Sequence, residues 1–367
     1  MSKKNALLKK AVYPVNEALE TYLDKYNRLS NIPISYDDLL RFSGSIVVYD
    51  KNEEDTLWIR LFYQDHERDG IDESLKKIYS LLHADGSTEI YKYLQVDAID
   101  FCTFGNTKPF RIKIRNILND NSIYIYIKKA DASRVYGLEL EHLLSPNRIN
   151  FLVFQNTLIE EHIAGIPGDI FLKNHLEHCL ESEKSQIAKE FVKFNERCSI
   201  RLLGDMRSYN YVVVPTHDFD QVVYRIRAID FDQQSYEGSF KIYKPQFFKE
   251  NSVLVKLVSS KLDENAIVQY QLEERSLLSK RFLSSERRIM KLLRIMMIDK
   301  VSNTENVEQL KTELIAYTSH IEFKKCKTMG EIMKTALDFV VRNYRNINPK
   351  KDIGKFKSII KMNQKMD

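Results

Sequence analysis

An ordered set of acidic and amide residues around a predicted β-hairpin constrains this chain more than any other feature. Asp205 is followed five residues later by Asn210, which leads directly into the apolar run Tyr211–Val214. A second apolar run, Tyr224–Ile229, ends at Asp230-Phe231-Asp232. Because two strands joined by one turn start and finish at the same edge of a sheet, we expect Asn210 and Asp230 to lie side by side.

The residue types in this set suit phosphate chemistry with magnesium. Mg²⁺ prefers oxygen ligands and is usually held by one or two carboxylates together with substrate phosphates. Asn210 and Asp230, with Asp232 beside them, are therefore candidate metal ligands. Asp205 is a candidate for orienting a hydroxyl that attacks a phosphoryl group. The residues Thr216-His217-Asp218 predict the turn of the hairpin.

Length and composition indicate a globular protein. The chain has 367 residues, enough for two or three domains with a sizeable core. No run approaches the roughly eighteen apolar residues of a membrane-spanning helix, and the basic N-terminus lacks the apolar stretch of a signal peptide. The four cysteines are scattered, which indicates free thiols in a reducing compartment. We therefore expect a cytoplasmic protein without membrane contact.

The positive charge is concentrated at the C-terminus. The formal net charge is +5, and residues 341–367 hold eight Lys or Arg and two Asp. A solvated basic tail over 346–367 is one interpretation, and binding of an anionic partner is the other. No interleaving of aromatic and basic residues and no zinc-finger pattern supports a nucleic-acid partner.

The pattern of apolar residues predicts an α+β protein. Residues 1–90 read as an N-terminal α+β extension, with strands over 45–50 and 56–63 and a helix over 72–83. Residues 91–164 then read as three strands, one helix and two strands. These predicted elements cover residues 89–104, 110–117, 122–129, 133–144, 149–154 and 158–163.

A mostly helical part follows over residues 165–345. Asp169 is a natural N-cap for a helix over 170–180, and a second helix is expected over 183–197. Beyond about residue 245 the spacing predicts only helices, including a long one over 273–298.

These motifs resemble the protein-kinase-like superfamily, and the resemblance covers roughly residues 95–300. In that family the catalytic loop reads Asp, four residues, Asn, which Asp205 and Asn210 match. The family's metal-binding acid begins Asp-Phe-Gly, and Asp230-Phe231-Asp232 matches it at two positions. The resemblance implies a bilobal fold, with a β-rich small lobe and a helical large lobe, that binds ATP and Mg²⁺.

The resemblance also implies a lysine and a glutamate in the small lobe. The family's strand lysine follows alternating apolar residues, and Lys128 fits that position, with Lys129 as an alternative on the opposite face of the strand. The lysine's helix partner would be Glu139, which falls on the buried face of its helix, whereas Glu141 is expected to point away.

The nucleotide base and ribose have their own candidates. The segment 160–165 is similar to the hinge whose backbone pairs with adenine, which implies contacts from Glu161 and Ile163. Asp169, just past that segment, would reach the ribose.

The chain departs from the regulated protein kinases at several positions. Gly204 replaces the arginine that precedes the catalytic Asp, and Arg207 stands where a lysine contacts the γ-phosphate. The Gly-rich loop is absent, with only Gly105 in a plausible turn, and Asp232 replaces the last glycine of Asp-Phe-Gly. No Ala-Pro-Glu segment follows. These features are more similar to the aminoglycoside phosphotransferase and HipA-like branches.

Several functions agree with these residues. The leading one is transfer of the γ-phosphoryl group of ATP to a hydroxyl of a protein or a small molecule. A pseudokinase or scaffold that binds nucleotide without catalysis is an alternative, motivated by the missing Gly-rich loop. A nucleotidyl transferase on the same fold is a second alternative, and a basic nucleic-acid-binding protein is a third. The acceptor and the oligomeric state stay open.

Overall fold

The computed structural model of the protein describes residues 10–83, 86–104, 107–218 and 221–343, so Gly105 and the predicted basic tail lie outside the described residues. The chain divides into two units. The first comprises Met1–Ala132 with Ile149–His162, and the second comprises Ser133–Arg148 with Ile163–Asp367. Within the described ranges, no helix is both long enough and apolar enough to cross a membrane.

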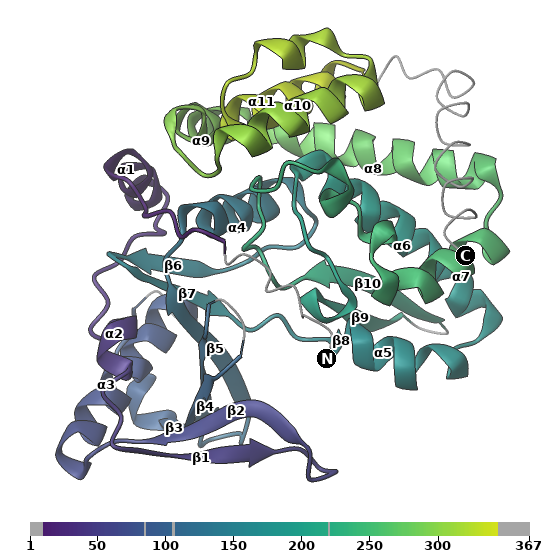
Figure 1. Ribbon diagram of the computed structural model, residues 1–367. Coiled ribbons are helices and arrows are strands. Elements are labelled where there is room, and N and C mark those ends of the chain that lie inside the picture. Colours follow the sequence, from purple (N-terminus) through teal and green to yellow (C-terminus); the bar gives the residue numbers. More distant parts are fainter. Residues whose placement is uncertain (1–9, 84–85, 105–106, 219–220, 344–367) are drawn as a thin grey trace, which may run out of the picture. The chain divides into compact units, whose positions relative to one another are not determined.

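A seven-stranded antiparallel sheet forms the first unit, in the order β1-β2-β3-β4-β5-β7-β6 (Figure 1). Alternating apolar residues produce these strands because every second side chain enters the core. The predicted order of three strands, one helix and two strands is present as β3, β4, β5, α4, β6 and β7. Their bounds are Leu94–Cys102, Phe110–Asn116, Ser122–Lys129, Ala132–Leu144, Phe151–Phe154 and Thr157–Glu161.

The N-terminal residues extend this sheet. The predicted hairpin is present as β1 (Gly44–Tyr49) and β2 (Asp55–Phe62), and β2 pairs with β3. Residues before 90 therefore share one unit with the strands that follow, in agreement with an extension of the sheet. The helices described in this part of the chain are α1 (Glu17–Lys25), α2 (Tyr36–Leu39) and α3 (Asp65–His83).

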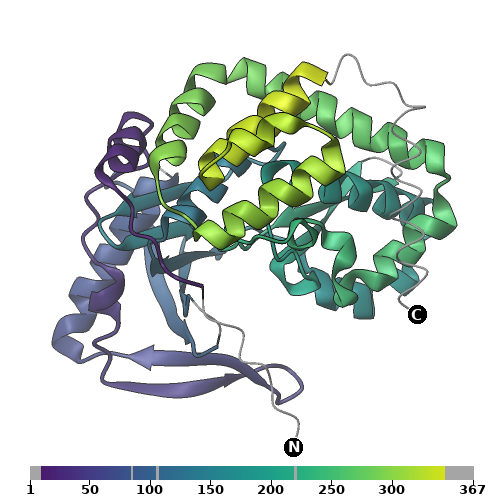
Figure 2. The same ribbon diagram turned by 45° about the horizontal axis from the view of Figure 1, so that its top comes forward.

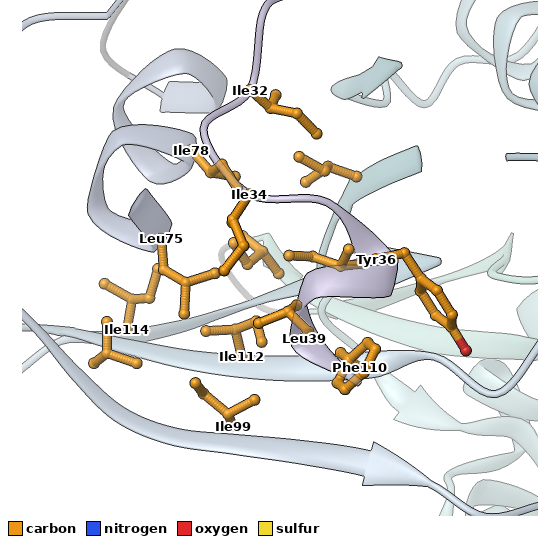
Figure 3. Packing of buried hydrophobic residues seen from close by; sticks show 14 of the residues in the cluster. Ile32, Ile34, Tyr36, Leu39, Leu75, Ile78, Ile99, Phe110, Ile112 and Ile114 are labelled. Carbon is orange, nitrogen blue, oxygen red and sulfur yellow. The ribbon is translucent and has the colours of Figure 1, made fainter. Parts of the chain in front are cut away.

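The core of the first unit lies between one face of the sheet and the segment that carries α2 and α3 (Figure 3). Leu75 and Ile78 of α3 pack against Ile99, Ile112 and Ile114 from the sheet, and all five side chains are buried. Burial of a side chain of this size contributes roughly 1.5–3 kcal/mol, so this face holds α3 on the sheet.

A small antiparallel sheet, in the order β10-β9-β8, lies in the second unit. β9 (Tyr211–Asp218) and β10 (Gln221–Ala228) form the predicted hairpin, and β8 (Ile166–Pro167) pairs with β9. The expected turn at 216–218 is wrong, because those residues belong to β9.

Helices make up the rest of the second unit, and α9, α10 and α11 lie close to one another in both views (Figures 1 and 2). Gly330 permits close packing of α11 on α9, since an added Cβ would lie 2.1 Å from the carbonyl oxygen of Met296. The helices after α4 are α5 (Gly168–Asn174), α6 (Glu181–Arg201), α7 (Ser252–Lys261), α8 (Glu264–Ser284), α9 (Glu286–Ile298), α10 (Thr304–Thr318) and α11 (Met329–Asn343).

Two helix predictions need correction. The helix expected over 273–298 is two helices, because the backbone of Ser285 leaves the helical conformation between α8 and α9. The helix expected over 170–180 is α5, which ends at Asn174. Asp169 lies in its first turn, and the N-cap position belongs to Pro167.

The two units divide the chain differently from the predicted lobes. Ser133–Arg148 belongs to the second unit, although the sequence suggested one lobe over 91–164.

Candidate functional site

The loop that follows α6 carries three of the predicted site residues. Leu202 ends the helix in the left-handed conformation, with φ at 50°, and turns the chain toward Asp205. The amide of Asp205 donates to the carbonyl of Ile242 at 3.0 Å. Buried Asn251 donates to the carbonyl of Met206 at 2.9 Å. The loop is thus held at both of these points by the chain after β10.

Gly204 is required by this packing. Its amide donates to the carbonyl of Gln233 at 3.1 Å. A Cβ at Gly204 would lie 2.9 Å from Ile242 Cγ2 and 3.1 Å from the Gln233 oxygen. The approach of two chain segments therefore explains the glycine at this position, which the sequence showed only as a departure from the family pattern.

Asp205 combines an unusual backbone conformation with a carboxyl whose pKa is raised. Its φ is +57°, a strained value for a residue other than glycine. Burial raises the pKa of its carboxyl above the ordinary value, the nearby charges of Asp230 and Glu250 raise it further, and the hydrogen bond from Arg207 opposes them. A raised pKa makes a carboxylate a better proton acceptor near neutral pH.

Asn210 links the loop to the hairpin. Its side-chain Nδ2 donates to the backbone oxygen of Asp205 at 2.7 Å. The pairing of Tyr211 with Ala228 places Asn210 beside the end of β10, where Ile229 donates its amide to the Asn210 carbonyl at 3.1 Å. The hairpin therefore brings Asn210 and Asp230 to one edge of the small sheet, as the sequence predicted.

Arg207 is held by carboxylates on two sides. Its Nε lies 2.9 Å from Asp205 Oδ1, and its Nη1 lies 2.7 Å from Glu250 Oε1. Its guanidinium also lies 5.0 Å from the centre of the Phe248 ring. This side chain is thus fixed next to the predicted base.

The two acids after β10 share one arginine. Arg134 Nη1 lies 2.8 Å from Asp230 Oδ1 and 2.5 Å from Asp232 Oδ1. Side-chain exposure is 35% for Asp230 and 18% for Asp232, but only 1% for Arg134. The sequence does not single out this arginine, because a lone Arg in a predicted helix has no distinguishing pattern.

Two further acidic residues near the loop were also missed. Glu250 pairs with Arg207, and Glu237 lies close enough to Asp205 that the negative charge of Asp205 adds to burial in raising the pKa of Glu237. Both follow Asp230 in sequence and belong to no recognisable motif. They make the surroundings of Asp205 strongly acidic.

The donor atoms at this edge fit a magnesium ion bound together with phosphates. In the described parts of the chain, no group of three or more His, Cys, Asp or Glu side chains forms a metal site by itself. Mg²⁺ seldom needs such a cage, because waters and substrate phosphates complete its shell. The Asn210 side-chain oxygen and the Asp230 carboxylate are oxygen donors of the right type, although Asp230 also binds Arg134.

In the first unit, the two candidate lysines differ in environment. Lys128 is buried, and its Nζ lies 3.0 Å from Glu160 Oε2 on the adjacent strand β7. Lys129 is exposed and pairs with Asp37 at 3.3 Å. The alternation of the strand therefore places them on opposite faces, as expected.

The α4 glutamates correct one prediction. Glu139 is fully buried, as expected, and it receives a hydrogen bond from Arg288 Nε at 2.7 Å. Glu141 was expected to point away but is also buried, where it pairs with Arg201. Helical spacing alone missed this because a buried arginine makes a second acidic position of the helix compatible with the core.

Of the two predicted hinge residues, Glu161 belongs to the first unit and Ile163 to the second. The amide of Glu161 donates to the carbonyl of Asn150 at 3.1 Å. Within the described residues, neither the amide nor the carbonyl of Ile163 makes a hydrogen bond. Asp169 is exposed in the first turn of α5.

Two comparisons with known proteins were without a match. No protein-family model matches the sequence, and a search of curated proteins finds no match.

Proposed function

We propose that the protein is an ATP- and Mg²⁺-dependent phosphotransferase with an atypical protein-kinase-like fold. The observation that carries the proposal is the connection of Asp205, Asn210 and Asp230 through one loop and one hairpin. The order of three strands, one helix and two strands that precedes these residues along the chain supports the kinase-like fold.

Each residue of the site has a chemical role in this proposal. Asp205 accepts or orients the proton of the attacking hydroxyl, and its raised pKa favours that role. Asn210 Oδ1 and Asp230 would hold Mg²⁺, with Asp232 as an additional acid beside them. When bound, Mg²⁺ supplies charge stabilisation to the phosphate oxygens.

Arg207 would contact the γ-phosphate, and its ion pairs give it a second role. Because Asp205 and Glu250 hold its guanidinium from two sides, it enters the site in a fixed orientation. It also fixes Oδ1 of Asp205, while Oδ2 lies 3.4 Å from Asn210 Nδ2. In this proposal Oδ2 accepts the proton of the hydroxyl.

The phosphates, the adenine and the ribose of the nucleotide each have their own candidate residues. Lys128, rather than Lys129, is the better candidate for the phosphates, because a buried lysine paired with a glutamate matches the type of environment that the family's strand lysine has. Here its partner is Glu160, and Glu139 has Arg288 instead. Adenine would bind the backbone at Glu161 and Ile163, where the Ile163 groups have no partner among the described residues, and Asp169 would reach the ribose.

A pseudokinase is the second candidate function. The observation that favours it is the ion pair of Arg134 with Asp230 and Asp232, because a cation already lies at the predicted metal ligands. In this case the protein would bind nucleotide weakly or without metal and would transfer no group.

One experiment separates these functions. Purified full-length protein is incubated with Mg²⁺ and either γ-labelled or α-labelled ATP, together with candidate protein and small-molecule hydroxyl acceptors. Transfer of the γ label alone supports phosphoryl transfer, whereas transfer of the α label supports a nucleotidyl transferase. If neither label is transferred and ATP still raises the thermal midpoint, the pseudokinase is favoured. If neither label is transferred and ATP gives no thermal shift, both the phosphotransferase and the pseudokinase are excluded.

The acceptor class and the compartment complete the proposal. The acceptor is a hydroxyl of a protein or of a small molecule, and the two are distinguished in the same assay by where the label is recovered. The four cysteines are free, which supports a reducing compartment such as the cytoplasm.

A further inference from the structure

The first turn of α4 carries Arg134, whose guanidinium contacts two of the predicted metal ligands. Its Nη1 lies between Asp230 Oδ1, at 2.8 Å, and Asp232 Oδ1, at 2.5 Å. Its Nη2 also lies 3.5 Å from the carbonyl oxygen of Ile229. A buried cation from α4 therefore lies against the segment that follows β10.

Two residues of α4 near Arg134 also contact the segment that follows β10. Ser133 donates from its hydroxyl to the carbonyl of Gln234 at 2.6 Å. Gly137, one turn further along α4, lies against the segment closely enough that an added Cβ would be 3.1 Å from the Cβ atoms of Phe231 and Gln234. Arg134 thus belongs to a contact that fixes the position of the chain after β10.

The charge of Arg134 is permanent, because a guanidinium is not deprotonated in proteins. Asp230 and Asp232 are close neighbours with Asp205 nearby, so their negative charges repel one another when no cation is present. A positive charge between two of these acids offsets the repulsion. The same charge repels a divalent cation that approaches Asp230 from the solvent side.

We propose that Arg134 is a positioning residue that holds Asp230 and Asp232 in the metal-free site and sets how tightly a divalent cation binds there. This inference rests on the proposed function, because it takes Asp230 as a metal ligand. Arg134 is too deeply buried to contact a substrate, so its effect on the metal passes through the two carboxylates. The residue of α4 that contacts the proposed metal ligands is therefore Arg134. Glu139 of the same helix pairs with Arg288 instead.

The test compares the full-length wild-type protein with R134M and R134K. Binding of Mn²⁺ is followed by the loss of the EPR signal of the free ion, and thermal midpoints are measured in MgCl₂ and in EDTA. We expect R134M to bind Mn²⁺ at least about tenfold more tightly than wild type, because one repelling charge is removed. We also expect R134M to lose thermal stability mainly in EDTA, where nothing replaces the lost cation. R134K should resemble wild type, since its ammonium group keeps the charge.

The double variant R134M/D232N covers the case in which R134M fails to fold. It removes one charge of each sign, so the proposal expects it to fold in EDTA and to keep Mn²⁺ affinity near that of wild type. Equal Mn²⁺ affinity of R134M and wild type, or an equal loss of stability in MgCl₂ and EDTA, overturns the proposal. Failure of both R134M and the double variant to fold in EDTA overturns it too, because packing alone would then explain Arg134.

The outcomes for Arg134 are separable from those for the proposed function. If wild type shows Mg²⁺-dependent ATP binding and R134M changes neither readout, only the role of Arg134 is wrong. If wild type and R134M bind neither Mn²⁺ nor Mg²⁺-ATP, the proposed function and the role of Arg134 are both wrong.

Discussion

Asn210 donates a hydrogen bond from its side-chain Nδ2 to the backbone oxygen of Asp205, over 2.7 Å. This contact ties the start of β9 to the loop that carries the predicted base. It also directs the amide nitrogen inward to the loop, so the oxygen of the same amide is the atom available to a cation. One side chain thereby connects the proposed base with the proposed metal site.

Replacing Asp205 by Asn should remove activity while leaving nucleotide binding intact. D205N keeps the shape of the side chain but cannot accept the proton, and we expect kcat to fall roughly 10²–10⁴-fold. ATP affinity, measured by calorimetry, should change little because Asp205 is not among the proposed metal ligands. A parallel loss of ATP affinity and activity would contradict the role assigned to Asp205.

The same variant should be more stable than wild type near neutral pH. The pKa of Asp205 is raised in the folded protein, mainly by burial, so the ionised carboxylate costs folding free energy. That cost is absent below the ordinary carboxyl pKa and grows as pH rises through the raised pKa. We therefore expect the gain in thermal midpoint of D205N over wild type to be largest at neutral pH and to vanish in acid. A gain that is independent of pH would contradict this environment for Asp205.

Two substitutions of Asn210 should separate its two roles. N210A loses the hydrogen bond to Asp205 and should lower the free energy of unfolding by about 1 kcal/mol. It should also raise the Mg²⁺ concentration needed for half-maximal activity. N210D keeps an oxygen for the cation but has no donor for the loop, so it should retain the Mg²⁺ response better than N210A. Equal Mg²⁺ responses in the two variants would contradict the metal role.

Lys128 and Lys129 provide a matched pair of substitutions. K128M removes the cation that pairs with buried Glu160, so we expect a loss of about 3–5 kcal/mol in stability, most of which K128M/E160Q should recover. Both variants should bind ATP at least about tenfold more weakly by calorimetry, because the phosphate contact is lost. K129M should bind ATP as wild type does. Normal ATP affinity in the stable K128M/E160Q protein would exclude Lys128 from the nucleotide site.

Local sequence signals predicted the hairpin and the residues that lie together at its open end. The apolar runs around the turn fixed the pairing of β9 with β10, and with it the proximity of Asn210 to Asp230. The turn itself was misplaced, because residues 216–218 have turn-forming types but continue β9. Turn propensity was weaker here than strand pairing.

The partners of charged residues could not be predicted. Arg134 pairs with Asp230, and Arg288 pairs with Glu139. In each pair the two residues are far apart in the sequence. Such pairs depend on how helices pack, and no periodicity in a single sequence records that packing. The break at Ser285 was not predicted because the apolar stripe continues past this residue, whose backbone leaves the helical conformation.

Titration of ATP into the full-length wild-type protein and D230N, each in Mg²⁺ and in EDTA, tests most directly whether Asn210 and Asp230 form a metal–nucleotide site. We expect Mg²⁺ to tighten ATP binding by wild type at least about tenfold and to leave binding by D230N unchanged. Wild-type protein that binds no ATP, or that binds it equally well in Mg²⁺ and in EDTA, would contradict the site.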